Sequence, residues 1–231
     1  MTTTPTPPAF PPAGRWVEVW LSAPRFAVYL AATGADRERA LALYEWNAQL
    51  SAALLHDLAH LEVGLRNAYD VALSGRWPGP PHWTLAADTV FAPVYRRRGR
   101  RRVDVNNRPR DSLRHAIANA GGPTAPPGKI VAELTFGFWR YLSSAAHEKT
   151  LWVPALHRAF PPGTDRAVHV DGPVGRLHGL RNRVAHHEPL LTTDISGRLA
   201  DLIGLAARLD PQLGQYLLAT STVANLLRSR P

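Results

Sequence analysis

A stripe of leucines at helical spacing is the most regular hydrophobic pattern in the chain. Four of them follow one another at i, i+4, i+7 and i+11: Leu54, Leu58, Leu61 and Leu65. This spacing places all four on one face of an α-helix. Asp36 can cap the start of such a helix with its carboxylate, and Gly75 is a suitable terminator. The pattern therefore predicts one long helix between Asp36 and Gly75.

Shorter patterns with the same period predict helices over much of the remaining chain. They lie at 24–34, 111–120, 127–142, 151–160 and 171–188, with two or three more within 193–228. Residues 76–110 contain several prolines and no helical period, which predicts a loop. We find no segment that alternates in the manner of a β-strand. The expected fold class is therefore all-α, a multi-helix bundle.

The N-terminal segment differs in composition from the rest. Residues 1–14 are rich in threonine and proline, which is typical of a flexible or polyproline-like tail. We expect residues 15–231 to form a single helical domain. The tail lacks the basic and apolar regions of a signal peptide, and no run of about 18 apolar residues could cross a membrane. A cytoplasmic protein with no membrane partner is expected.

The chain carries a formal net charge of +9, almost all of its positive charge coming from arginine. A surplus of this size favours an anionic partner such as nucleic acid, although the same charge could serve solubility alone. The absence of cysteine excludes disulfides, thiolate metal ligands and cysteine nucleophiles. His56 and His60 are four residues apart, but the residues between them do not form a zinc motif. We expect no metal and no cofactor.

Six arginines surround one glycine between residues 96 and 102. They are Arg96, Arg97, Arg98, Arg100, Arg101 and Arg102. Such a block can bind RNA by contacting phosphates without reading the sequence. It could also be a solvated loop, or a surface for an acidic antitoxin or a phage protein.

Residues 181–189 combine the side chains needed for metal-free RNA cleavage. On a helix, His178, Asn182 and His186 share one face. Arg181 lies between this polar face and an apolar stripe, which consists of Leu177, Leu180 and Val184. A guanidinium can bind a phosphate through two hydrogen bonds, and a nearby histidine can transfer protons near neutral pH. Only RNA offers an internal 2′-OH nucleophile next to the phosphate.

Two histidines compete for the proton-transfer role. His186 follows Arg181 after four intervening residues and His187 after five. Sharing a face with Asn182 favours His186. Pro189 predicts that the helix ends at Glu188. Both histidines therefore lie in its last turn, where helical spacing no longer determines the direction of a side chain. The simpler interpretation is that these basic side chains only stabilise the helix dipole.

This segment resembles the Arg-x4–6-His motif of the HEPN superfamily of ribonucleases. Arg181, Asn182 and His186 carry the motif, and residues 180–189 resemble the Abi-like (abortive infection) branch of the superfamily. Three earlier segments match that branch in order: 43–47, 61–67 and 133–139. The resemblance extends from roughly residue 21 to the C-terminus.

The resemblance implies an all-helical bundle that acts as a metal-independent endoribonuclease in antiphage defence or as a toxin. Such enzymes usually build one site from two copies of the motif. This chain has one good copy, because no histidine follows Arg66 at the required spacing. A homodimer is therefore implied, with Arg181 and His186 from each subunit. An antitoxin or a phage-derived trigger would regulate it.

Five further residues are expected to support Arg181, Asn182, His186 and His187. They are Glu62, Arg66, Asn67, His178 and Glu188. Glu62 and Arg66 have the order and spacing of an ion pair within one helix. Alternatively, one of them faces the motif helix and orients Arg181. Two other functions stay open, a non-catalytic HEPN module that binds RNA or protein and a DNA-binding helical protein.

Overall fold

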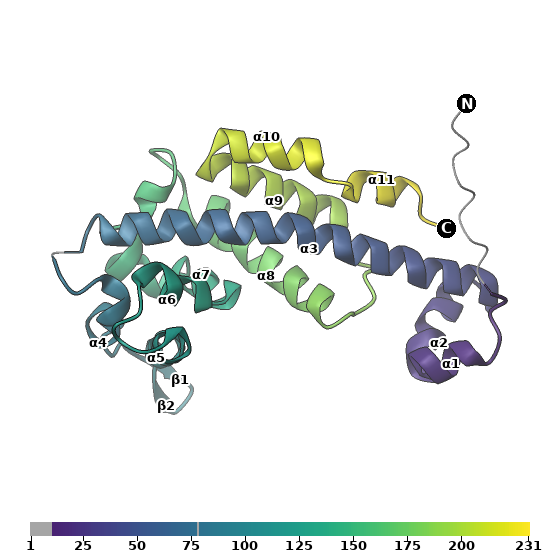
Figure 1. The fold of residues 1–231 in the computed structure, drawn as a ribbon, viewed down its shortest axis with the longest axis horizontal. Helices are drawn as coiled ribbons and strands as arrows, with labels where there is room; N and C mark the ends of the chain where they lie inside the picture. Colours follow the sequence, from purple (N-terminus) through teal and green to yellow (C-terminus); the bar gives the residue numbers. More distant parts are fainter. Residues whose placement is uncertain (1–10, 78) are drawn as a thin grey trace.

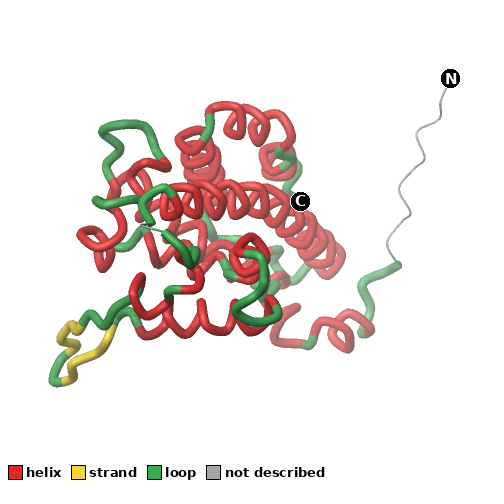
Figure 2. Tube along the Cα trace, turned by 60° about the vertical axis from the view of Figure 1, so that its left-hand side comes forward, coloured by secondary structure: helices red, strands yellow, loops and turns green. Residues whose placement is uncertain are grey.

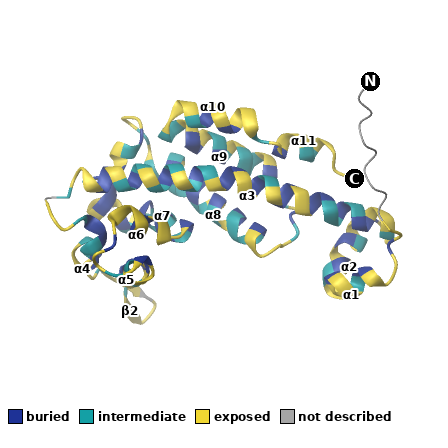
Figure 3. Ribbon diagram, viewed as in Figure 1, coloured by how far each residue is buried: buried dark blue, intermediate teal, exposed yellow. Residues whose placement is uncertain are grey.

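The long helix predicted from the leucine stripe is α3 (Arg37–Ser74), which runs along the length of the molecule (Figure 1). The computed structural model describes residues 11–77 and 79–231. Asp36 caps the helix, because its Oδ1 accepts a hydrogen bond of 3.0 Å from the backbone N–H of Arg39. The four leucines of the stripe are all buried, and buried positions recur along α3 in Figure 3. This prediction is confirmed, and the fold is all-α.

The N-terminal residues pack against the first turns of α3. Two short helices lie there, α1 (Trp16–Leu21) and α2 (Ala23–Ala32). Arg37 joins them to α3, since its Nε donates to the carbonyl of Ala13 at 2.6 Å and its guanidinium pairs with Glu18 at 2.6 Å. Residues 11–14, which the composition groups with the tail, therefore contact α3. Residues 1–10 lie outside the described residues.

Four helices of the C-terminal half lie alongside α3 (Figure 1). They are α8 (Gly172–Ala185), α9 (Ile195–Leu209), α10 (Pro211–Thr220) and α11 (Val223–Arg228). The last three confirm the helices expected within 193–228. Hydrogen bonds attach this group to α3, from Trp46 Nε1 to the carbonyl of Leu226 at 2.7 Å and from Ser221 Oγ to Asp57 Oδ2 at 2.6 Å.

Residues 83–142 form short elements grouped near the C-terminal end of α3 (Figure 1). In order they are η1 (Trp83–Leu85), α4 (Ala87–Val90), β1 (Tyr95–Arg98), β2 (Arg101–Asp104), α5 (Asn107–Ala120), α6 (Pro127–Glu133) and α7 (Phe136–Leu142). The prediction of a loop over 76–110 is wrong, because β1 and β2 pair as an antiparallel hairpin. Strand alternation is visible in a sequence only when one face is apolar, and this hairpin carries arginines in both strands.

Two predicted helices are interrupted. The helix expected over 127–142 breaks at Leu134, whose ψ of 128° is extended, although the apolar residues of its stripe are all buried. The helix expected over 151–160 is replaced by short turns, because Pro154 has no backbone N–H to continue a helix. The turns in this range are η3 (Glu148–Trp152) and η4 (Leu156–Ala159), and η2 (Ala145–His147) and η5 (Ala167–Asp171) lie before and after them.

Among the helices of the described residues, none combines the length and the apolar character that a membrane crossing requires.

A buried histidine, His147 of η2, connects the short turns after α7 to the base of the β1–β2 hairpin. His147 is 1% exposed, and its Nε2 lies 2.7 Å from Oδ1 of Asn106. Burial lowers the pKa of His147 to about 4 from its ordinary 6.5. The folded protein therefore holds this side chain neutral at pH values where the unfolded chain protonates it.

Acid is expected to destabilise the fold through His147. Between pH 6.5 and about 4 the unfolded chain binds a proton that folded His147 does not, so the free energy of unfolding falls as the pH is lowered. The loss between pH 7 and pH 5 is about 2 kcal/mol. Urea unfolding at the two pH values measures it. His147→Gln should flatten this dependence and exposed His115→Gln should keep it; an unchanged dependence in His147→Gln would contradict the assignment.

Candidate functional site

Helix α8 presents the motif and packs its apolar stripe against α3. Leu177, Leu180 and Val184 are buried, as predicted. The helix ends at Ala185, however, and not at Glu188. The backbone N–H of Glu188 donates to the carbonyl of Arg183 at 2.9 Å, and that of His187 donates to the carbonyl of Val184 at 3.0 Å. These two bonds form a Schellman motif, which ends the helix. The helix therefore ends ahead of the residues whose conformation Pro189 restricts.

His187 occupies the left-handed position that this motif requires. Its φ is 55°, a conformation that glycine adopts most readily and that costs other residues free energy. His186 is the C-cap, with φ −92° and an exposed side chain. Neither histidine belongs to the regular helix. The helical period that places His178 and Asn182 on one face therefore stops before His186.

Glu62 of α3 lies between α8 and the start of α7. Burial raises the pKa of Glu62, and three neighbours oppose this change: the guanidinium of Arg181, the backbone N–H of Phe136 and Arg66. The N–H of Phe136 belongs to the first residue of α7, which follows the helix break at Leu134. The structure thus brings Glu62 to the motif helix, whereas the recorded interactions of Arg66 are with Glu62 and Asn67 of its own helix. This is the arrangement in which Glu62 can orient Arg181.

Helix α7 contributes a further guanidinium that the sequence analysis missed. A Cβ at Gly175 of α8 would lie 3.6 Å from Nη2 of Arg140, so the Arg140 side chain rests directly on α8. A Cβ at Gly137 would lie 3.1 Å from Nε2 of His178. Burial lowers the pKa of His178, and the charges of Arg140 and Arg181 add to this. One feature of the sequence could have indicated Arg140: it directly follows segment 133–139, which resembles the Abi-like branch.

No carboxylate of the described residues makes a direct ion pair with the guanidinium groups of this cluster. Among the described residues, neither Arg140 nor Arg181 forms a salt bridge, and both are half-buried. Glu62 is the acidic group whose electrostatic interaction with Arg181 the structure records. A site with an excess of fixed guanidinium groups is suited to an anion with several oxygen atoms, such as a phosphate.

A cavity of about 240 Å³ adjoins the C-terminal end of α8. Its lining consists of Tyr44, Asn47, Ala48, Ser51, Ala52, Leu55, Val184 and His187. Ser51 is 6% exposed, and its Oγ has no hydrogen-bond partner. Ser51, Leu55, Glu62 and Arg66 lie at i, i+4, i+11 and i+15, so the cavity and the Arg181 cluster follow the same face of α3.

Other predicted site residues lie elsewhere or have other contacts. Asn67 lines a separate groove with Leu209, on another side of α3 from Glu62. Glu188 pairs with Arg183 at 3.3 Å, which stabilises the chain after the helix rather than Arg181. Asn182 is half-buried on α8, and its carbonyl accepts the N–H of His186 at 2.9 Å. The arginines of the 96–102 block lie on the hairpin.

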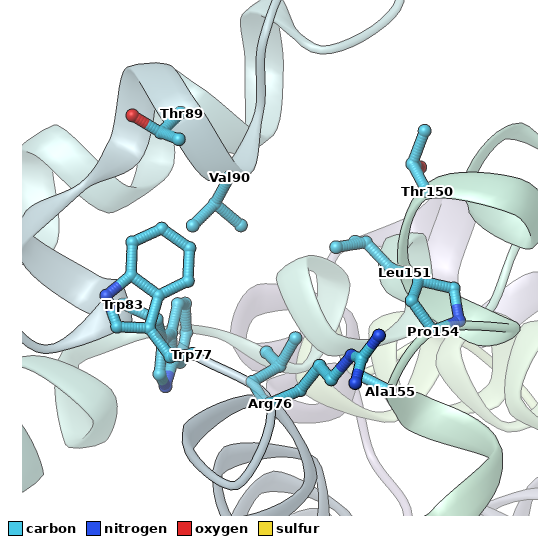
Figure 4. Close-up of a pocket in the computed structure, with 10 residues that line it drawn as sticks. Arg76, Trp77, Trp83, Thr89, Val90, Thr150, Leu151, Pro154 and Ala155 are labelled. Atoms are coloured by element: carbon cyan, nitrogen blue, oxygen red, sulfur yellow. The ribbon is translucent and has the colours of Figure 1, made fainter. Parts of the chain in front are cut away.

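A second cavity, of about 230 Å³, adjoins the C-terminal end of α3, whereas the cavity at His187 adjoins residues 44–55 of that helix. Figure 4 shows the residues that line the second cavity. Its walls include Trp77, Trp83 and Leu151, with Arg76 as its charged residue. Without a titratable group that could exchange protons near neutral pH, this cavity offers no acid–base chemistry. It is a weaker candidate site than the Arg181 cluster.

Within the described residues, no group of three or more histidine, aspartate or glutamate side chains could hold a metal ion. Comparison with models of known families, with curated proteins and with solved structures gives no match to this chain.

Proposed function

We propose that the chain is a metal-independent endoribonuclease of antiphage defence or a toxin system, with Arg181 on the scissile phosphate and His186 in proton transfer. The observation that carries the proposal is that Arg140 and Arg181, neither of which forms a salt bridge among the described residues, both lie near His178 on the helix whose C-cap is the exposed His186. The placement in defence or toxin systems rests on the resemblance of residues 180–189 to the Abi-like branch of the HEPN superfamily.

The reaction needs a base and an acid, which His186 of each subunit would supply in the composite site. The ribose 2′-oxygen attacks the adjacent phosphorus while a base removes its proton, and the bond from phosphorus to the 5′-oxygen breaks as that oxygen is protonated. The products are a 2′,3′-cyclic phosphate, which water can open to a 3′-phosphate, and a 5′-OH. Arg181 stabilises the charge that develops on the phosphorane, and Asn182 orients the site.

The two histidines receive different roles in this proposal. His187 ends the helix in a left-handed conformation and lines the cavity beside Val184. Both histidines are exposed, but His186 is the C-cap and does not occupy the left-handed position that closes the helix, so its ring can turn toward an RNA in solvent. We therefore assign proton transfer to His186 and a structural role to His187.

Assembly as a homodimer with a composite site is part of the proposal. Four apolar residues are exposed on the face of α3 beside the His187 cavity, at i, i+4, i+7 and i+11: Ala48, Ala52, Leu55 and Ala59. An exposed apolar face of this kind is typical of a surface that packs against another protein. Its small side chains leave room for a helix of the second copy. The mass in solution, measured by light scattering, tests this part of the proposal.

RNA cleavage in EDTA tests the function itself. The purified chain is expected to cleave RNA with chelator present and to leave 5′-OH ends. Loss of cleavage on chelation would contradict a metal-independent mechanism. If the chain binds RNA without cutting it, and induction in cells stops growth equally with His186→Ala, the non-catalytic HEPN module is the better description. Tighter binding to duplex DNA than to RNA, at equal salt, would favour the DNA-binding alternative.

A further inference from the structure

The arginine block forms a two-stranded ribbon that projects from the helical body (Figure 2). Strands β1 and β2 are joined at Gly99 and Arg100, and Gly99 has a φ of 60°. A two-residue hairpin turn requires this left-handed conformation, which glycine adopts without strain. The described arginines of the ribbon are exposed. What the sequence indicates as a loop is therefore a ribbon with two defined faces.

The register of the ribbon places arginines on both faces. Arg97 lies opposite Arg102, and residues directly opposite one another share a face. Arg96 lies opposite Val103, so Arg96 and Arg101 belong to the other face. Like charges directly opposite each other destabilise a hairpin. None of these four arginines forms a salt bridge within the described part of the chain.

The base of the ribbon is held firmly by hydrogen bonds. Asp104 Oδ1 accepts the backbone N–H groups of Val94 and Asn106, each at 3.0 Å. Its Oδ2 pairs with Arg110 at 2.5 Å, and Arg110 also donates to the carbonyl of Phe91 at 2.6 Å. A network of this kind fixes the direction in which the ribbon points. The charged faces are therefore presented at a defined angle.

We infer that the hairpin enters a groove of a double-helical segment of the RNA substrate, with phosphates facing both sides of the ribbon. A single strand would contact one face and leave the repulsion on the other face uncompensated. In an A-form RNA duplex the accessible groove is the wide, shallow minor groove, which has a phosphate backbone along each edge, so a ribbon lying in it meets phosphates on both sides. Duplex RNA is recognised mostly by shape and backbone contacts, which exposed arginines supply. The identity of the nucleic acid as RNA rests on the proposed function.

The test compares the two faces of the ribbon. Arg97→Gln/Arg102→Gln removes two charges from one face and Arg96→Gln/Arg101→Gln two from the other. A fluorescent RNA duplex of about 20 base pairs, a single strand of the same length and the matching DNA duplex are titrated at several salt concentrations. For the RNA duplex, each double variant should reduce the slope of the logarithm of the binding constant against the logarithm of the salt concentration by about two. The variant that combines all four substitutions should reduce this slope by about four.

Two controls accompany the hairpin variants. Arg39→Gln/Arg228→Gln removes two exposed arginines at the opposite end of α3 and should leave the slope unchanged. Arg97→Lys/Arg102→Lys keeps the charge and should keep the slope, which separates loss of charge from misfolding of the ribbon.

Three results would overturn the inference. They are a slope change from only one face, single-stranded RNA binding as tightly as the duplex, and equal binding of the DNA duplex. Binding is measured with Arg181→Ala, so RNA stays intact. An RNA duplex bound through both faces but never cut by the wild type would contradict the proposed function and leave this inference standing. Cleavage that does not depend on either face of the ribbon would contradict this inference and leave the proposed function standing.

Discussion

Arg181→Ala is expected to lower the rate of RNA cleavage at least about 100-fold, because it removes the cation that stabilises the developing charge on the phosphate. Arg181 is half-buried on α8 and lies within electrostatic reach of Glu62 of α3, so the packing of the helix limits the positions open to its guanidinium before RNA binds. A group positioned in advance stabilises the transition state without the cost of reorganisation. Single-turnover cleavage at saturating enzyme measures this rate separately from binding.

Arg183→Ala is the matched control for this variant. Arg183 lies two residues along the same helix, and its side chain contacts the segment after the helix, through Glu188 and the carbonyl of Pro189 at 2.9 Å. We expect it to retain cleavage within about tenfold of the wild type, with binding changed only through the lost charge. Equal losses in both variants would reduce Arg181 to one of many charges that attract RNA.

His186→Ala is expected to reduce cleavage at least about 100-fold, a typical loss when a general acid or base is removed. His187→Gly should retain cleavage within about tenfold, in line with the structural role assigned to His187. Glycine adopts the left-handed conformation that His187 holds at φ 55°. The free energy of unfolding should therefore stay unchanged or rise by up to about 1 kcal/mol.

Cleavage and thermal unfolding of the two variants are measured together. If His187→Gly is stable and inactive while His186→Ala still cuts RNA, proton transfer belongs to His187 and our assignment is wrong. If both are folded and active, neither histidine transfers protons in the reaction.

The parts of the fold that follow from local periodicity could be predicted from the sequence. The leucine stripe of α3 and the apolar stripe of α8 repeat every three or four residues, and burial of those residues determines the helices. The end of α8 could not be predicted in the same way. It depends on the backbone conformation of His187, and histidine is an uncommon choice where glycine is the usual residue.

Long-range contacts account for most of what the sequence analysis missed in the site. Arg140 reaches the motif because α7 packs on α8 at Gly137 and Gly175, and nothing local to Arg140 indicates this contact. Glu62 and Asn67 lie in one matching segment but on different sides of α3, which separates their roles. The hairpin carries no alternation of apolar and polar residues, so its pairing becomes visible only in three dimensions.

The role of the 2′-OH as nucleophile is tested with RNA that carries a single 2′-deoxy nucleotide at a mapped cleavage position, incubated with the protein in EDTA. Cleavage at this position should be lost, because the attacking hydroxyl is absent, while neighbouring positions should still be cut to 5′-OH ends. Cleavage that persists at the deoxy position, or products with 5′-phosphates, would contradict the claim that the 2′-OH is the nucleophile.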